Sequence, residues 1–362
     1  MPLHGVINAE RVIAVALLIF YIHQFFSEEK NIKSKLEYSS LGLSVLVGLA
    51  AFIGIYQINF QEIFRLILII WTVPFLKFCI DQYGTKKIIF LCLTILSIHG
   101  VWGISQFIFQ KDFGLNYLGE SHLSVEQNGV AKFLFQGQKI IRAYGLYAHP
   151  NIFSAAMLVG IILLLNSVWN ENKKIFYFSF LIFLVALLTT FSRAAIIGLF
   201  IFLAINFFKK KNIKIIFLLT LICVTLFAPL YFYRTTDSED RGVSERKSGA
   251  VWAMQIIKQN SWRGVGVGNY SEALKSYLEK NKIEYNKWEV QPVHSVPLLF
   301  FAEWGIVGLI VVSGGLVIAL KQKKSELITL LIVLSPVILF DHYLATQTAP
   351  LVWVLLLAHL ED

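Results

Sequence analysis

The sequence predicts an all-α, polytopic integral membrane protein with about 11–12 membrane-spanning helices and one large external loop. Of the 362 residues, 56% are hydrophobic and only 15% are charged, whereas soluble domains have roughly 25% charged residues. The mean hydropathy is +0.65. Apolar residues come in nearly continuous blocks of about 16–22, the length that a helix needs to cross roughly 30 Å of hydrocarbon.

Each apolar block is assigned one helix, and strand alternation is absent, which argues against a β-barrel. The first block, VIAVALLIFYIHQFF, lacks the cleavage site of a signal peptide and is followed by EEKNIKSK, so we interpret it as a retained helix. One membrane domain over residues 1–362 is expected, because no clear repeat or low-complexity tract divides the chain. The helices are expected at 11–26, 38–56, 60–80, 88–109, 149–169, 175–191, 194–208, 213–233, 293–320, 325–340 and 344–360.

Lysines set the expected orientation of these helices. Short Lys clusters lie in the joints between apolar blocks, for example KKKNIK at 209–214. If that joint is cytoplasmic, the alternation of the helices puts all the remaining short Lys clusters on the cytoplasmic side too, as the positive-inside rule prefers. Two longer polar segments then lie outside: a first external loop at 110–148 and a main external loop at 234–292. The net charge of +9 therefore reflects topology and does not point to nucleic acid.

The arginines follow a different pattern. The cytoplasmic joints contain Lys only, whereas arginines lie in or beside external segments or near the external ends of helices, at positions 11, 65, 142, 193, 234, 241, 246 and 263. The Arg side chain presents a planar fork of donors that suits bidentate binding of phosphate or carboxylate. An anionic ligand at the outer face is therefore expected.

His294 begins the segment HSVPLLFFAEWGIVGL, where the main external loop meets a membrane helix. An imidazole at this rim suits a general base; the alternative is an interfacial histidine that hydrogen bonds a loop carbonyl. Glu303 lies roughly 13 Å deeper on a helix and points away from His294, so it is not a direct partner. A carboxylate inside the membrane is energetically unfavourable, and Glu303 is expected to bond neighbouring helix ends through loosened backbone near Gly305.

Two arginines are placed by helix geometry. TTFSRAAIIG puts Arg193 in a tight turn between two membrane helices, at the rim of the bilayer. In SERKSGAVWAMQIIKQN, small and apolar residues recur at the spacing of a short amphipathic helix that presents Arg246 on the outer surface. The alternatives are a snorkelling anchor for Arg193 and a solvated charge at the helix start for Arg246.

Two further segments put polar groups on the outside. RAYGLYAHPN carries Arg142 and His149 ahead of a membrane helix, and its Pro150 suits the first helical turn. His149 is expected to act as a structural cap. FDHYL adds Asp341 and His342.

Other binding motifs are matched only in part. GVGVGNY at 264–270 lacks the Lys-Ser/Thr and the strand-to-helix setting of a phosphate loop, so a tight turn is expected. DSED at 237–240 could hold a divalent cation through oxygen ligands, but a solvated loop is the preferred interpretation. The cysteines at 79, 92 and 223 fall inside apolar blocks and give no metal or disulfide framework.

Taken in order, RAYGLYAHPN, FSRAA, ERKSGAVW, GVGVGNY, HSVPLLFFAEWGIVGL and FDHYL resemble the O-antigen ligase and polymerase superfamily, over about residues 140–345. Members are membrane glycosyltransferases that move glycans from a polyprenyl diphosphate carrier. The sequence departs from the family at Ser295, where Asn often follows the histidine, and the expected helices are one fewer than is usual.

The resemblance implies a site and a mechanism. It assigns diphosphate binding to Arg193 and Arg246, activation of the acceptor hydroxyl to His294 and a supporting role to Asp341; Arg142 belongs to a family motif and is expected to bind substrate. The implied reaction is a metal-independent, inverting transfer from an undecaprenyl diphosphate donor to a glycan or lipid acceptor, with no cofactor. The implied location is the outer face of the bacterial cytoplasmic membrane, among membrane lipids, in polysaccharide biosynthesis for the cell envelope.

Alternatives stay open at this point. Ligase and polymerase are not distinguished, because the acceptor is not evident from the residues. A transporter or flippase of an anionic lipid or glycan would use the same arginines, but it needs polar groups down to the midplane, where Glu303 and His99 form no continuous path. A structural envelope subunit is disfavoured by the convergence of Arg and His at one rim.

Overall fold

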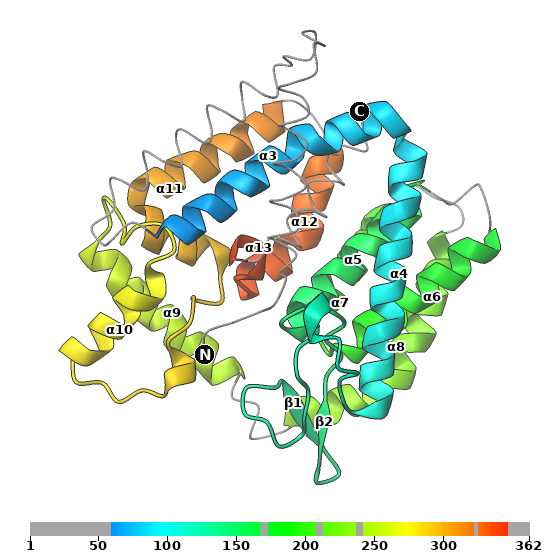
Figure 1. The fold of residues 1–362 in the computed structure, drawn as a ribbon, viewed down its shortest axis with the longest axis horizontal. Helices are drawn as coiled ribbons and strands as arrows, with labels where there is room; N and C mark the ends of the chain where they lie inside the picture. The colour runs from blue at the N-terminus through cyan, green and yellow to red at the C-terminus, as the bar shows by residue number, and fades with distance from the viewer. Residues whose placement is uncertain (1–58, 168–172, 208–212, 237–241, 322–324, 347–362) are drawn as a thin grey trace. The chain divides into compact units, whose positions relative to one another are not determined.

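The computed structural model of the chain describes residues 59–167, 173–207, 213–236, 242–321 and 325–346 (Figure 1). Within these ranges, regular structure is helical apart from one β-hairpin and two short 3-10 turns. The predicted all-α fold is therefore confirmed. The helices expected at 11–26 and 38–56 lie outside the described residues, as does most of the helix expected at 344–360.

Each expected helix that falls within the described residues is present. Those before the main external loop are α3 (Phe60–Tyr83), α4 (Thr85–Phe109), α5 (Pro150–Ser167), α6 (Lys173–Thr189), α7 (Arg193–Phe207) and α8 (Ile213–Thr236). Those after it are α11 (Val296–Lys321), α12 (Ser325–Phe340) and the short α13 (Tyr343–Thr346). The main external loop itself holds the expected amphipathic helix, α9 (Gly242–Gln259), and a helix that the sequence analysis missed, α10 (Tyr270–Lys280).

Several of these helices suit a membrane. Thr85–Phe109 and Ile213–Phe232 are long and apolar enough to cross one, and Pro150–Asn166, Arg193–Phe207, Val296–Ile306 and Ile328–Phe340 are shorter apolar helices. The two long helices leave large apolar side chains exposed, among them Ile108 at 65% and Leu226 at 72%. Many large apolar side chains exposed on long apolar helices are what contact with lipid requires. The chain is accordingly described as an integral membrane protein.

The described residues form two compact units. The first contains α4 to α8 and residues 329–337 of α12; the second contains most of α3, then α9 to α11, and residues 338–346. A single membrane domain over the whole chain stays a prediction.

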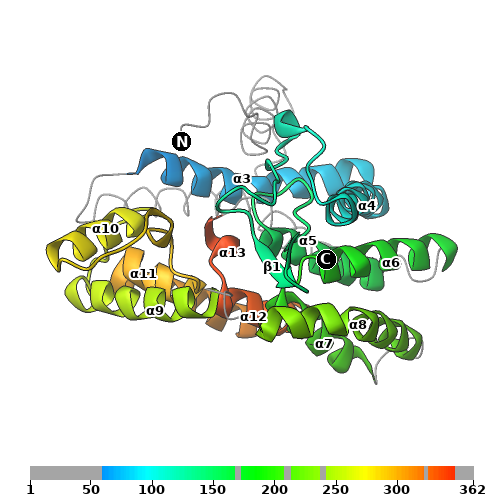
Figure 2. The same ribbon diagram turned by 90° about the horizontal axis from the view of Figure 1, so that it is seen from below.

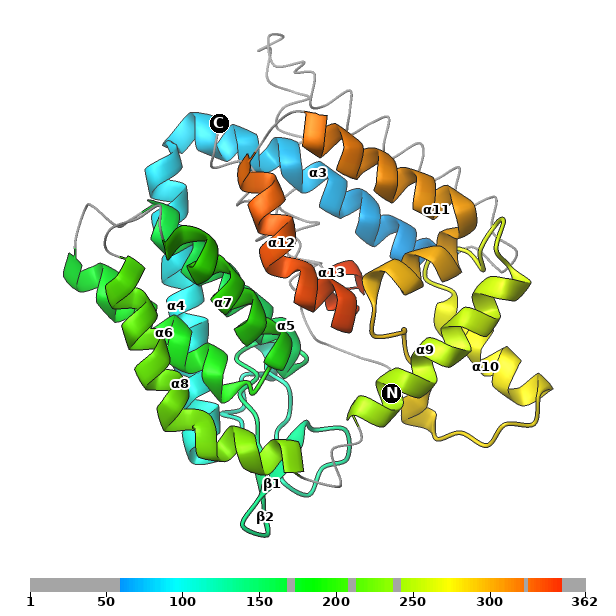
Figure 3. The same cartoon turned by 180° about the vertical axis from the view of Figure 1, so that it is seen from behind.

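α5 forms the core of the first unit (Figure 3). Every residue from Ile152 to Leu165 is buried, and α4, α6 and α7 pack against this helix. Glycines let the neighbours approach closely: a β-carbon at Gly103 would lie 2.3 Å from the ring of Phe153. Between membrane helices, such small residues allow the van der Waals packing that replaces a hydrophobic driving force.

The first external loop contains a β-hairpin, which the sequence analysis did not predict. β1 (Lys132–Phe135) pairs antiparallel with β2 (Gln138–Ile141), and the two residues between them have φ values of 50° and 80°, as a type I′ turn requires. The ring of Phe133 lies 4.4 Å from that of Phe191 in the α6–α7 turn. The hairpin thus covers the end of the first unit at which that turn lies.

In the second unit, α9, α10 and α11 pack around one apolar core (Figure 2). Its buried residues include Ala253 and Ile257 on α9, Leu274 on α10 and Leu299 on α11. The spacing of apolar residues that predicted α9 is therefore the spacing of the face that it buries.

α11 is not the continuous helix that was expected at 293–320. Gly305 has φ 58° and ψ −146°, which is not a helical conformation. The GVGVGNY turn packs into the break, where the N–H groups of Val265 and Gly266 donate to the carbonyls of Ala302 and Glu303, at 2.9 Å each. The expected tight turn is confirmed, and its partner is the backbone released by the kink.

Glu303 has the structural role that was expected of it. Its side chain forms hydrogen bonds with backbone groups of Gly268 and Tyr270, which belong to the turn. The same turn is tied to α3, because the Asn59 side chain donates to the carbonyl of Gly268 at 3.1 Å. Glu303 therefore joins the kinked helix to the main external loop.

Candidate active site

His294 lies in the second unit, between the 3-10 turn η2 (Lys287–Glu289) and α11. The N–H of Leu299 donates to the carbonyl of Ser295 at 3.0 Å, so Ser295 occupies the N-cap position of α11. Ser and Asn are both preferred at this position, which explains why Ser can stand where the resembled family often has Asn. The helix start thus fixes the backbone beside His294.

Asp341 is the nearest acidic partner of His294. It lies in the turn between α12 and α13, and its Oδ1 is 3.7 Å from Nδ1 of His294. The Asp341 side chain is buried, and the His294 side chain keeps 15% of its surface exposed. Nδ1 of His294 is itself buried and has no hydrogen-bond partner. The sequence could not predict that these two residues lie together, because they are 47 positions apart in the chain.

His342 completes a cluster with them. Its ring lies 5.0 Å from the ring of His294, and its Nδ1 is 2.8 Å from the hydroxyl of Thr346. Burial lowers the pKa of His342 to about 4; Asp341 acts against this shift and His294 adds to it. Within the described residues, one atom from each of His294, Asp341 and His342 lies within 4.8 Å of the others, which makes the cluster a candidate metal site.

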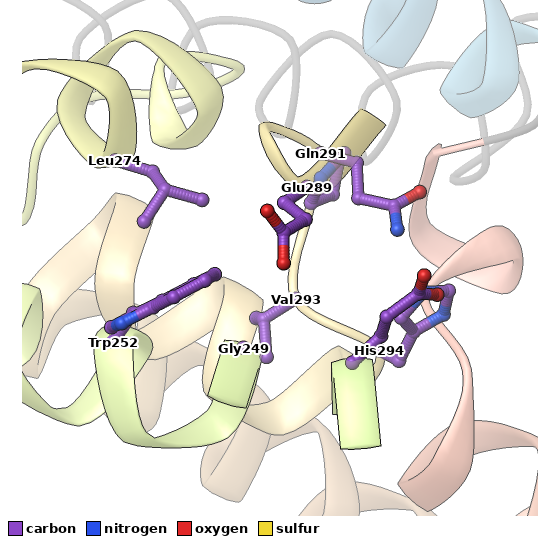
Figure 4. A pocket seen from close by; sticks show the side chains of 9 residues that line it. Gly249, Trp252, Leu274, Glu289, Gln291, Val293 and His294 are labelled. Atoms are coloured by element: carbon purple, nitrogen blue, oxygen red, sulfur yellow. The ribbon is translucent and has the colours of Figure 1, made fainter. Parts of the chain in front are cut away.

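A pocket opens beside His294 (Figure 4). Trp252 and His294 lie at opposite sides of it. Glu289 and Gln291 line it between them, and Glu289 is held by hydrogen bonds from the backbone and side-chain nitrogens of Asn286 at 2.6 and 3.2 Å. The sequence analysis did not identify Trp252, Glu289 or Gln291, because no spacing along the chain links them to His294.

Arg246 lies in the first turns of α9, the helix that contributes Glu245, Gly249 and Trp252 to the pocket. Its guanidinium Nε is buried and has no hydrogen-bond partner. A buried donor of this kind is unfavourable unless a ligand or water satisfies it. Arg246 as a whole is partly exposed, so a solvated charge at the helix start stays the alternative for it.

Arg142 and Arg193 lie in the first unit, where the structure brings their motifs together. Nε and Nη2 of Arg142 donate to the carbonyl of Thr190 and to Oδ1 of Asn151, both at 2.6 Å. The N–H of Ile196 donates to the carbonyl of Ser192 at 3.2 Å, so Ser192 caps the helix that Arg193 begins. Arg142 therefore braces the turn in front of Arg193.

His149 is confirmed as a structural cap. Its carbonyl accepts the N–H groups of Ile152 and Phe153 at 3.1 and 3.2 Å, and its Nδ1 accepts the N–H of Asn151 at 3.2 Å. α5 begins at Pro150, the position where a missing N–H does no harm. The DSED segment, the other candidate metal site, lies outside the described residues.

Comparison with known proteins identifies one family. Residues 178–313 match the family model described as O-antigen ligase. No curated protein and no solved structure matches the chain. The matched span runs from α6 into α11 and contains Arg193, Arg246 and His294, whereas Arg142 and Asp341 lie outside it. The resemblance noted in the sequence is confirmed.

Proposed function

We propose that this chain, whose residues 178–313 match the O-antigen ligase family model, moves a glycan from a polyprenyl (undecaprenyl) diphosphate donor to an acceptor hydroxyl. The family supports glycosyl transfer in a membrane; the donor, acceptor and mechanism are our proposal. The observation that carries it is the pairing of His294 with the buried carboxylate of Asp341 beside a pocket.

His294 is proposed as the general base. With a proton on Nδ1, which faces Asp341, the lone pair is on Nε2 and can accept the proton of an acceptor hydroxyl. The separation of 3.7 Å is longer than a hydrogen bond, and such contacts often tighten only when substrate is bound. Asp341 would orient the imidazole and stabilise the imidazolium as it forms.

The bond change is a single displacement. The acceptor oxygen attacks the anomeric carbon while His294 takes its proton, and the bond to the diphosphate oxygen breaks. The polyprenyl diphosphate leaves with the electron pair, and the anomeric configuration inverts. Because the arginines are proposed to stabilise the negative charge of the leaving diphosphate, the step is proposed to need neither a metal ion nor a nucleotide cofactor.

Arg246 is proposed to bind the diphosphate. Its buried, unpartnered Nε is a donor prepared for an anion, and charge stabilisation of a leaving group is often the largest catalytic contribution. Arg193, in the first unit, is proposed as a second diphosphate ligand on the strength of its motif alone. Arg142 was expected to bind substrate; we propose that it serves the site by bracing the turn that precedes Arg193.

The pocket beside His294 is proposed to seat the acceptor sugar. The flat face of the Trp252 indole suits the apolar face of a sugar ring, and the carboxylate of Glu289 and the amide of Gln291 suit its hydroxyls. A sugar in this pocket would present a hydroxyl towards His294.

The site is proposed to face the outside of the bacterial cytoplasmic membrane. The main external loop supplies α9 and most of the pocket residues, and His294 lies just after its end; the positive-inside rule puts that loop opposite the Lys joints. Membrane lipids would then surround the donor's polyprenyl chain.

A product assay tests the proposal. Purified protein in detergent is given a polyprenyl-diphosphate-linked glycan together with either a lipid A core or a second carrier-linked glycan as acceptor. We expect a new glycosidic bond of inverted configuration and release of one polyprenyl diphosphate per transfer; the acceptor that is used decides between ligase and polymerase. A glycan that stays on its carrier with both acceptors, but crosses the bilayer of protein-containing vesicles, would establish the transporter alternative instead.

A further inference from the structure

The structure assigns a second property to the cluster of His294, Asp341 and His342: we propose that it binds a divalent transition-metal ion of the zinc type, and that the bound ion switches transfer off. The three side chains each offer one ligand atom, and these atoms lie within 4.8 Å of one another. The inhibitory half of the proposal rests on the proposed function. The binding half does not.

The gap between His294 and Asp341 fits an ion. At 3.7 Å, Nδ1 and Oδ1 are too far apart for a hydrogen bond, yet Nδ1 is buried and has no hydrogen-bond partner. A tetrahedral zinc ion with bonds of about 2.0–2.2 Å holds its ligands roughly 3.4 Å apart. The two atoms therefore need to move by only a few tenths of an ångström.

His342 is oriented as a ligand by its neighbours. The Thr346 hydroxyl donates to the carbonyl of His342 at 3.3 Å and so has a lone pair left to accept the proton on Nδ1, at 2.8 Å. With the proton on Nδ1, the lone pair is on Nε2. The N–H of His342 also donates to Oδ1 of Asp341 at 2.8 Å, which orients the carboxylate. Partners of this kind are the usual support for metal-binding histidines and carboxylates.

The ligand types select the ion. Two imidazoles and one carboxylate, with a fourth position open, are typical of zinc sites. Mg²⁺ and Ca²⁺ prefer sets made wholly of oxygen, so they are not expected to compete. Two of the residues are buried and the third is half-buried, so that the ion would be partly sheltered from water.

The bound ion would remove the base. When a metal occupies Nδ1 of a neutral imidazole, the remaining proton is on Nε2. Nε2 of His294 then donates a hydrogen bond and cannot accept the proton of the acceptor hydroxyl. The ion also takes up the carboxylate of Asp341. Transfer would therefore stop while the ion is bound and resume when it is removed.

Zinc binding is measured first. The full chain in detergent is treated with EDTA, the EDTA is removed, and Zn²⁺ is then titrated in. We expect one ion per chain, and an affinity at least roughly tenfold weaker in His342→Ala and His342→Gln. The Gln variant keeps a polar side chain in case the Ala variant folds poorly. His122→Ala, which removes an exposed histidine of the first external loop, should bind zinc as the wild type does. Absence of binding to the wild type, or unchanged affinity in a folded His342 variant, overturns the proposal.

Transfer is measured second. Zn²⁺ should inhibit the wild type and EDTA should restore it, whereas the rate of His342→Gln with Zn²⁺ should equal that variant's own rate in EDTA. Transfer that is lost in EDTA and regained with Zn²⁺ overturns the inhibitory role. A wild type that binds zinc through His342 but forms no product in EDTA contradicts the proposed function and leaves the metal site standing.

Discussion

Two arginines show how different the tasks of one residue type can be. Arg142 is 6% exposed and uses Nε and Nη2 to hold a carbonyl and an amide oxygen of the first unit. The Nε of Arg246 is buried, and no group of the described structure accepts a hydrogen bond from it. The first arrangement braces a turn; the second underlies the proposal that Arg246 binds the diphosphate.

Substitution of arginine by lysine tests the binding of the diphosphate. Arg246→Lys and Arg193→Lys keep the charge but lose the planar fork of donors, so we expect the transfer rate to fall at least roughly tenfold in each. The measurement is the rate of product formation at saturating acceptor. Lys247→Ala, at an exposed neighbouring position of α9, is the matched control and should transfer normally. A wild-type rate in Arg193→Lys would leave that residue as a membrane anchor.

At the scale of elements, the kink in α11 organises the second unit. Gly264 has φ 69°, and a β-carbon there would lie 2.3 Å from the carbonyl oxygen of Glu303. A β-carbon at Gly305 would likewise lie 2.5 Å from the carbonyl oxygen of Trp262. The turn and the kinked helix thus touch backbone to backbone. Glycine is required on both sides because any side chain would separate them.

Gly264→Ala is expected to destabilise the protein by roughly 1–3 kcal/mol, because the added methyl group has no room and the positive φ is strained. Thermal unfolding in detergent measures the effect. Gly249→Ala is the control: its β-carbon meets nothing within 4 Å and it lies inside α9, where Ala favours the helix. Equal unfolding temperatures for the two variants would show that the turn does not hold the helix.

The helices were predictable because apolar length alone determines them. α6 and α7, for instance, begin within about two residues of their expected starts, since charged or capping residues interrupt the apolar blocks there. The hairpin at 132–141 and α10 were missed, because short elements in polar loops depend on tertiary contacts such as that between Phe133 and Phe191.

Residues of the candidate site could be singled out from the sequence, but their arrangement could not. His294 and Asp341 were singled out, and the structure places them side by side. No pattern along the chain could show that His342 and the pocket residues Trp252 and Glu289 join them, because folding brings these positions together from separate elements.

For the whole molecule, orientation in the membrane decides which substrates can reach the site. In the first unit, α6 begins with Lys173 and Lys174 and ends at the turn that leads to Arg193. The hairpin packs against this turn. Lysines and the arginine turn therefore mark opposite ends of one helix. The positive-inside rule then puts the hairpin end outside.

An accessibility scan tests this orientation. In a background without native cysteines, Lys139→Cys in the hairpin and Lys280→Cys in α10 should react with a membrane-impermeant maleimide from outside, whereas Lys174→Cys should react only after the membrane is opened. All three positions are exposed, so burial does not prevent the reaction. External labelling at 174, or protection at 139, would reverse the topology and with it the location of the site.

The transfer rate of His294→Ala, measured with purified protein and a lipid-linked glycan, tests most directly whether this is a glycosyltransferase with a histidine base. We expect the rate to fall by roughly 10²- to 10⁴-fold while the protein stays folded, because the acceptor hydroxyl then has no group to take its proton. His122→Ala should transfer normally, and EDTA should not slow the wild type. A wild-type rate in His294→Ala would contradict the mechanism, as would transfer that EDTA abolishes and Mg²⁺ or Mn²⁺ restores.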